Sequence, residues 1–165
     1  MAIPFKIRKA ELRDVETLVR MRFELLHVAA ALGVPKDLSE SEWEAVREST
    51  REYFSRALPA GEHCGVVAEA EGIVVGCGGM VFMERPPYQG NLTGREAYLM
   101  NMYTEPAWRG KGIGAAIVRE LLRYAREAGA RRVSLDAEQK ARRLYAKAGF
   151  HGSVEAMEIL FLGTN

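Results

Sequence analysis

The period of the hydrophobic positions changes several times along the chain, and each change predicts an element. Alternating apolar and charged residues over Pro4–Ala10 predict a first strand. Apolar residues at helical spacing predict a helix over Leu12–Ala31. Ser39 and Glu42 have the spacing of a capping box, which predicts a second helix that begins at Ser39 and ends near Pro59.

The middle of the chain is dominated by β-type patterns. The segment Gly65–Met83 reads as two apolar strands joined by a tight turn at Glu71-Gly72. Proline and glycine then fill a loop over Glu84–Arg95, which is either a lid or a surface loop without a role. A further strand is predicted over Glu96–Thr104.

The last third of the chain alternates helical and strand patterns. An amphipathic helix runs from Ile113 to Ala128 and ends at Gly129, which is a typical C-terminal cap. A strand over Arg131–Ala137, a short helix over Lys140–Phe150 and a last strand over Val154–Leu162 follow. The resulting order is β-α-α-β-β-β-α-β-α-β, which predicts an α/β fold with a central sheet flanked by helices.

Composition and charge narrow the classes of partner. The 165 residues have the length of one domain, so we expect a single domain over residues 1–165. A net charge of +1 argues against a nucleic-acid binder, and no apolar run is long enough for a membrane span. The N-terminus has no signal-peptide pattern, and Cys64 and Cys77 fit a reducing compartment, so a cytoplasmic location is expected. The cysteines are too few and too isolated for a metal site.

The stretch "WRGKGIGAA" at Trp108–Ala116 places a glycine-rich turn between a predicted strand and a predicted helix. The first N–H groups of a helix lack internal partners and attract anions, so this position suits a phosphate. The spacing alone is equally compatible with a flexible entry to the helix. It excludes the dinucleotide pattern G-x-G-x-x-G and the P-loop pattern G-K-[ST]. The glycines are Gly110, Gly112 and Gly114, and the cations beside them are Arg109 and Lys111.

Two motifs together resemble the GNAT acyltransferase superfamily. "RGKGIG" at Arg109–Gly114 matches Q/R-x-x-G-x-G/A, and "ARRLYAKAGF" at Ala141–Phe150 is similar to A-x-x-L-Y-x-x-x-G-F. The resemblance covers nearly the whole chain and implies a GNAT-type mixed central sheet and acetyl-CoA as cosubstrate. It also implies that the pyrophosphate lies on the loop formed by Arg109, Gly110, Lys111, Gly112, Ile113, Gly114 and Ala115.

The resemblance further implies that the fourth strand separates from the fifth through a bulge. The freed backbone would then bind the pantetheine arm through Met102 and Thr104, which flank Tyr103. An unpaired strand edge offers the donors and acceptors that the two pantetheine amides need.

Tyr145 stands where the family often carries a tyrosine that acts as general acid. A phenol is protonated at pH 7 and can donate to a departing thiolate. The alternative is an aromatic residue that packs on the core. The apolar positions Ala141, Leu144 and Ala148 are spaced as a stripe, which leaves Tyr145 beside it.

No residue is an obvious general base. Many relatives place a glutamate where this chain has Tyr98. Glu96, two residues earlier, lies on the same face by strand alternation and is a candidate base, but a solvated strand-end charge is the preferred interpretation of it. Alternatively, the amine loses its proton to a water molecule that Tyr98 or Asn101 orders.

The acceptor pocket is less defined. Asn101 is a polar residue within an apolar strand, so it is either a structural hydrogen-bonding group or part of the pocket. Glu24 and His27 on the first helix either line the acceptor site or are simply solvated.

The sequence thus predicts an acyltransferase that moves an acetyl group from acetyl-CoA to a primary amine of a small molecule. The amine attacks directly through a tetrahedral intermediate, without a metal, and neither cysteine is close to the site in sequence. A non-catalytic acyl-CoA sensor and an enzyme that modifies protein N-termini or lysines are the alternatives. A homodimer is compatible with the family.

Overall fold

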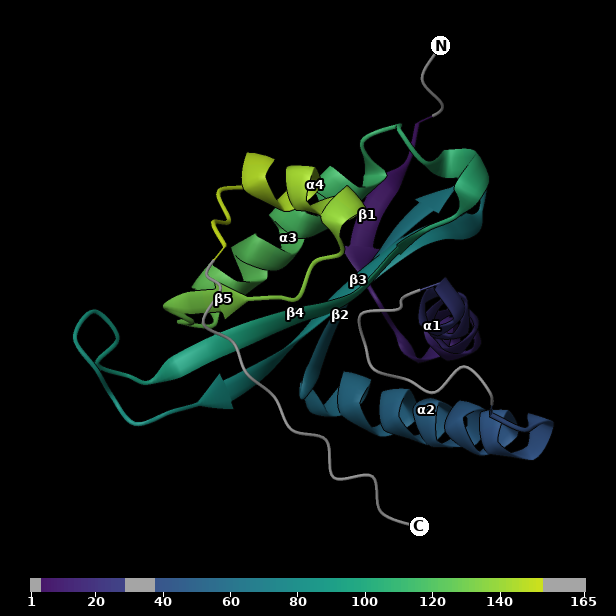
Figure 1. Ribbon diagram of the computed structural model, residues 1–165, viewed down its shortest axis with the longest axis horizontal. Coiled ribbons are helices and arrows are strands. Elements are labelled where there is room, and N and C mark those ends of the chain that lie inside the picture. The colour runs from purple at the N-terminus through teal and green to yellow at the C-terminus, as the bar shows by residue number, and fades with distance from the viewer. Residues whose placement is uncertain (1–3, 29–37, 153–165) are drawn as a thin grey trace.

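A five-stranded mixed sheet forms the centre of the molecule in the computed structural model, which describes residues 4–28 and 38–152 (Figure 1). Neighbouring strands follow chain order, and every pair is antiparallel except the last, β4 with β5, which is parallel. The strands are β1 (Lys6–Lys9), β2 (His63–Ala70), β3 (Ile73–Glu84), β4 (Arg95–Thr104) and β5 (Arg132–Ser134).

Helices cover both faces of this sheet. The first two pack together on one face, and the third lies on the other face with the fourth against it (Figure 1). Each face has its own apolar core, which agrees with a layered α/β arrangement. The helices are α1 (Val15–Val28), α2 (Glu40–Ala60), α3 (Ile113–Glu127) and α4 (Arg142–Lys147). Among the described residues, no helix is long and apolar enough to cross a bilayer.

Local sequence signals account for the boundaries that the sequence predicts well. The Glu42 N–H donates to Ser39 Oγ at 3.3 Å and the Ser39 N–H donates to Glu42 Oε2 at 2.7 Å, which completes the capping box of α2. Glu71 and Gly72 have φ angles of 52° and 78°, as expected for the tight turn between β2 and β3. The predicted order is confirmed from β1 to α4, and the predicted strand over 154–162 lies outside the described residues.

The largest departure from the predicted elements is in β5. It has three residues instead of the predicted span 131–137, because its pairing with β4 ends at Tyr98 and Ser134. A strand needs a partner for its backbone groups, and the chain turns away from β4 after this pair. The helix predicted over 140–150 is also shorter, with a 3-10 turn before α4.

A β-bulge interrupts the pairing of β3 with β4. The register shifts between Cys77 and Gly79, so that β4 has one extra residue there. Asn101 lies in this region with a φ of 57°, a left-handed conformation that is uncommon for a residue with a side chain. A Cβ on the facing Gly78 would overlap the ends of the Met102 and Ile117 side chains, the latter at 2.7 Å, so a larger residue here would require these side chains to shift. The bulge confirms the expected irregularity of the fourth strand.

Candidate active site

Among the residues that the structure describes, the separation of β4 from β5 leaves part of β4 without a strand partner on that side. Pairing runs through Ala97 with Val133 and Tyr98 with Ser134 and then ends, although β4 continues to Thr104. Met102 lies within this unpaired part. The predicted pairing of its backbone with pantetheine stays a prediction, and the geometry provides the open edge that the pairing requires.

The loop before α3 has the geometry of an anion site. Gly110 and Gly112 have φ angles of 75° and 84°, and no other atom lies within 4 Å of where a Cβ would be. The first helical hydrogen bond runs from the Ala116 N–H to the Gly112 carbonyl, and the N-cap residue Gly112 has no side chain that could cap the helix. The N–H groups of residues 113–115 therefore lack helical partners and can bind a phosphate.

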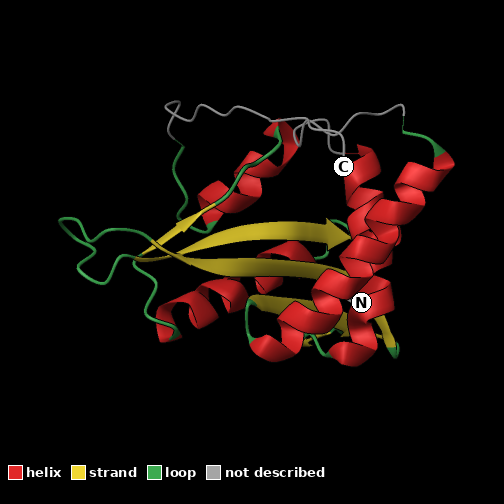
Figure 2. Cartoon of the chain, turned by 90° about the horizontal axis from the view of Figure 1, so that it is seen from below, coloured by secondary structure: helices red, strands yellow, loops and turns green. Residues whose placement is uncertain are grey.

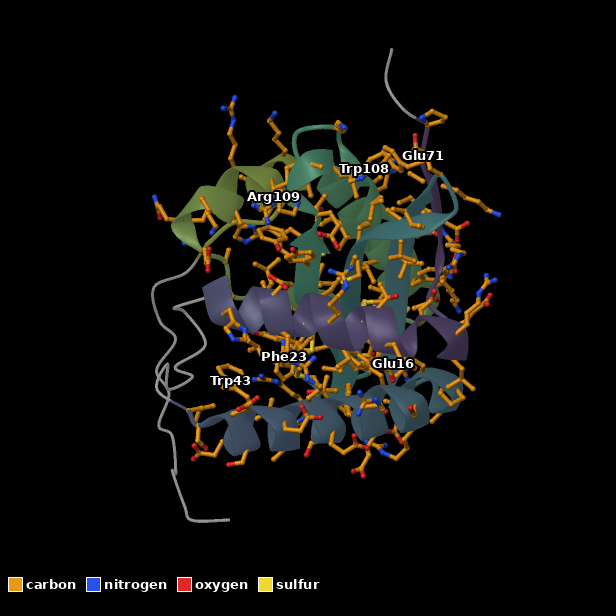
Figure 3. The ribbon with its side chains drawn as sticks, turned by 90° about the vertical axis from the view of Figure 1, so that its right-hand side faces the viewer. Glu16, Phe23, Trp43, Glu71, Trp108 and Arg109 are labelled. Carbon is orange, nitrogen blue, oxygen red and sulfur yellow. The ribbon has the colours of Figure 1, made fainter. Side chains whose placement is uncertain are left out.

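The third glycine of the loop has a different role. A Cβ on Gly114 would lie 3.3 Å from Leu144 Cδ2, so this glycine brings α3 close to α4. The two cations beside the loop, Arg109 and Lys111, are exposed, and their contribution to phosphate binding stays a prediction. The Arg109 Nε donates to the Thr104 carbonyl at 3.0 Å, and the Lys111 Nζ lies 4.7 Å from the centre of the Trp108 ring. Figure 3 shows Trp108 and Arg109 on one side of α1, with Phe23 and Trp43 on the other.

Tyr145 is more buried than the sequence suggests. Its side chain is 7% exposed and packs edge-on against Phe150, whereas Ala148 of the predicted apolar stripe is exposed. The predicted stripe is therefore wrong at Ala148, whereas Ala141 and Leu144 pack against the core together with Tyr145, the buried residue of α4. Burial raises the pKa of the Tyr145 phenol, which keeps the hydroxyl protonated and able to donate. Its role as general acid stays a prediction.

A tyrosine and a carboxylate meet where the two strands separate. The Tyr98 hydroxyl donates to Asp136 Oδ2 at 2.6 Å. Tyr98 is the last residue of β4 that pairs with β5, and Asp136 lies in the segment that follows β5. Asp136 is exposed, so its carboxylate is accessible to a ligand and to water. The sequence analysis missed Asp136. Its signal was its place two residues after Ser134, which puts both on one side of an extended segment.

Glu96 is not the solvated charge that the sequence favoured. Its side chain is 1% exposed, and its carboxylate accepts from the Tyr88 hydroxyl at 2.8 Å and pairs with Arg85 at 3.4 Å. These contacts hold the loop between β3 and β4 against the start of β4. Figures 1 and 2 both show this loop projecting beyond the helices, so it does not cover the separation of β4 from β5.

Asn101 connects the bulge to both of its neighbours. Its side-chain oxygen accepts a hydrogen bond from the Arg22 guanidinium of α1, and its carbonyl accepts from the Cys77 thiol at 3.4 Å. Cys77 is therefore close to the candidate site in space, although distant in sequence. Burial raises the pKa of its thiol to about 12, so it is not a nucleophile at neutral pH.

Arg22 is the second residue that the sequence analysis missed. It is half-buried between α1 and the sheet, and burial lowers the pKa of its guanidinium. The phenols of Tyr53 and Tyr98 are close enough to oppose this shift. Helical spacing on α1 gave no signal, because Arg22 follows the fully buried Met21 on an otherwise ordinary amphipathic helix.

The two candidate acceptor residues on α1 have different surroundings. The His27 ring stacks on Trp43 at 4.5 Å, and its Nδ1 lies 2.8 Å from the Phe23 carbonyl, so it joins α1 to α2. Glu24 is exposed, and its negative charge is close enough to Tyr103 to help raise the pKa of that phenol, which burial raises most. Their role in acceptor binding stays a prediction. Within the described ranges, no group of three or more potential ligands is placed to hold a metal ion.

These features together define a class of protein. An open strand edge, an uncapped helix N-terminus and a buried tyrosine lie at one junction, which can bind a cofactor with a pyrophosphate and an amide-bearing arm. The family model described as "Acetyltransferase (GNAT) family" matches residues 34–150, and the chain belongs to this family. It is an acyltransferase that uses acetyl-CoA as cosubstrate.

Relatives and solved structures agree with this assignment. A probable glucosamine 6-phosphate N-acetyltransferase 2 from Oryza sativa subsp. japonica is 30% identical over 162 residues, which cover 94% of this chain and 87% of the relative. The structure of a predicted acetyltransferase with acetyl-CoA from Clostridium acetobutylicum has a TM-score of 0.80 and 28% identity, and covers 95% and 96% of the two chains. The glucosamine-6-phosphate N-acetyltransferase of Arabidopsis thaliana, at 22% identity, a TM-score of 0.67 and coverage of 96% and 99%, shares the fold.

Proposed function

We propose that the protein acetylates a primary amine of a small molecule with acetyl-CoA. The observation that carries this proposal is the junction of an unpaired β4 edge with the uncapped N-terminus of α3. Acetyl-CoA would place its pyrophosphate on the loop at 109–115 and its arm along Met102 and Thr104. The thioester would then lie near the bulge, where backbone groups can polarise its carbonyl.

The Tyr98 and Asp136 pair is suited to the amine. A carboxylate at the separation of the strands attracts an ammonium group and takes its proton, and Tyr98 fixes the carboxylate through the 2.6 Å hydrogen bond. The neutral amine then attacks the thioester carbonyl to give a tetrahedral intermediate. When this collapses, the C–S bond breaks, the Tyr145 hydroxyl protonates the departing thiolate, and the proton that the nitrogen loses on becoming an amide returns through water to the Tyr145 phenolate. Most of the rate would come from proximity, because no covalent enzyme intermediate is involved.

The small-molecule acceptor is supported by the relatives, two of which are named as glucosamine 6-phosphate N-acetyltransferases. The two alternatives are a non-catalytic sensor of acyl-CoA and a protein acetyltransferase. The carboxylate placed at Tyr98 disfavours the sensor, since cofactor binding alone has no need of a group that accepts protons from an amine.

A screen of amines tests the proposal. Release of CoA thiol would be followed with acetyl-CoA and a panel of amino sugars, amino acids, polyamines and lysine peptides. We expect turnover above the hydrolysis background with at least one small amine. A protein that binds acetyl-CoA in calorimetry but releases no thiol with any panel member would be a sensor, and turnover of peptides alone would indicate a protein acetyltransferase.

A further inference from the structure

The Arg22 guanidinium lies at the bulge without a negatively charged partner. It donates to Asn101 Oδ1, and within residues 4–28 and 38–152 no carboxylate forms an ion pair with it. Its neighbour Arg20, which is more exposed, pairs with Glu105 at 2.6 Å. Of these two arginines, Arg22 is half-buried and, among the described residues, has no countercharge.

This arrangement is costly unless something compensates it. A guanidinium that is partly removed from water loses hydration, and a single neutral amide returns only part of that free energy. The same positive charge also lowers the pKa of buried His63, whose pKa falls to about 4 mainly through burial. A bound anion would stabilise Arg22 directly, since the planar fork of arginine matches phosphate and carboxylate oxygens.

The position of Arg22 connects it to the acceptor. Asn101 is next to Met102, whose backbone would hold the cofactor arm, so the guanidinium is close to where the acetyl group would lie. Tyr98 lies near Arg22 and also bonds Asp136. One small molecule could therefore place its amine at Asp136 and a second polar group at Arg22.

We infer that the acceptor carries an anionic group, a phosphate or a carboxylate, and that Arg22 binds this group beside the bulge of β4. The inference rests on the proposed function and adds the class of acceptor to it. A phosphate is consistent with the substrate in the names of the relatives. Arg22 is thus a specificity-determining residue, because it discriminates between amines without taking part in the bond changes.

Matched pairs of amines test this inference. Glucosamine 6-phosphate with glucosamine forms the phosphate arm, and serine with its amino alcohol serinol forms the carboxylate arm. We expect the wild-type protein to prefer the anionic member of one pair by at least about tenfold in kcat/KM. The pair that shows the preference identifies the anion. Equal kcat/KM values within both pairs overturn the inference and leave the acetyltransferase in place.

Variants of Arg22 separate recognition from structure. Arg22→Gln should lower kcat/KM for the preferred anionic amine by about 10- to 100-fold, the range expected for a charge-assisted hydrogen bond, mainly through KM. Its neutral partner should change by less than about twofold, and Arg22→Lys should recover part of the loss. The matched control Arg126→Gln removes an exposed arginine from the last turn of α3 and should change nothing. Equal losses for both amines of a pair assign Arg22 a structural role and overturn the inference.

Binding measurements keep the test valid if no amine is turned over, which would itself contradict the proposed function. Thermal unfolding with glucosamine 6-phosphate or serine should then raise the Tm of the wild-type protein and not that of Arg22→Gln. The same affinity of both proteins for acetyl-CoA would show that the variant is folded. No anion-dependent rise in the wild-type protein overturns the inference as well.

Discussion

The Tyr98 hydroxyl donates to Asp136 Oδ2 at 2.6 Å across the line where β4 and β5 separate. This bond joins the last paired residue of one strand to the segment that leaves the other. It places a carboxylate at the opening of the sheet, beside Tyr98, the position at which the resemblance to the family implies a glutamate in many relatives. In the proposed mechanism, Asp136 is the proton acceptor.

Removal of this carboxylate should slow acetyl transfer. We expect Asp136→Asn to lower kcat/KM by about 100-fold at pH 7, because the amine loses its proton acceptor. The loss should shrink as the pH rises, since more of the free amine is then already neutral. Steady-state rates from pH 6 to pH 9 measure both effects. Glu127→Gln, which changes an exposed carboxylate on α3, is the control, and an unaltered pH profile in Asp136→Asn would exclude the role.

The hydroxyl of Tyr145 can be removed without changing its ring contact with Phe150. Tyr145→Phe should lower kcat by about 100-fold, because the thiolate then departs without a proton donor. The affinity for acetyl-CoA, measured by calorimetry, should stay the same. Tyr124→Phe on α3 removes a phenol whose ring lies beside Lys9 and Arg123, and should leave kcat unchanged. Normal turnover of Tyr145→Phe would remove this residue from the mechanism.

Two glycines with the same backbone conformation separate stability from cofactor binding. Gly112 precedes α3 with a φ angle of 84°, and Gly129 follows the helix with a φ angle of 79°. Both have open space where a Cβ would lie. Alanine at either position should cost about 1–2 kcal/mol of stability, because a Cβ strains the left-handed conformation. Only Gly112→Ala should weaken acetyl-CoA binding, by about tenfold. Equal affinities of the two variants would mean that the loop does not hold the pyrophosphate.

His63 should make stability depend on pH in a defined window. Burial lowers the pKa of His63 from 6.5 to about 4, and the charge of Arg22 adds to the shift. Between pH 6.5 and about 4, the unfolded chain therefore binds a proton that the folded protein does not bind. The free energy of unfolding thus falls as the pH falls. From pH 7 to pH 5 this loss should be about 2 kcal/mol.

Urea unfolding at the two pH values measures the effect of His63. His63→Gln should remove most of the difference, because glutamine has no proton to bind, whereas His151→Gln at an exposed position should keep it. A variant with the wild-type pH dependence would show that other groups cause it.

The sequence predicts what local patterns determine. The Ser39 cap and the Glu71-Gly72 turn depend on residues within a few positions, and both are where their patterns place them. The glycines before α3 are informative because a positive φ and a helix start are local properties. The two-motif resemblance then supplied the family, which no single period or spacing could have provided.

The site residues that were missed depend on contacts between distant segments. Arg22 meets Asn101 across 79 positions, and Tyr98 meets Asp136 across 38. The hydrophobic patterns around Arg22 and Asp136 cannot show such contacts, because each of these two residues looks like an ordinary surface charge in its own segment. Glu96 was misjudged for the same reason, because its burial comes from the fold of the loop that precedes it.

β5 is attached to β4 by only three residue pairs, and this short attachment has a consequence for handling the protein. Within the described part of the chain, most of the β4 margin that faces β5 has no strand partner, so a foreign peptide or another molecule of the same chain could pair with it. A bound cosubstrate would occupy that margin during each turnover. Storage with CoA should therefore suppress self-association. A preparation that loses its CoA during purification should become turbid.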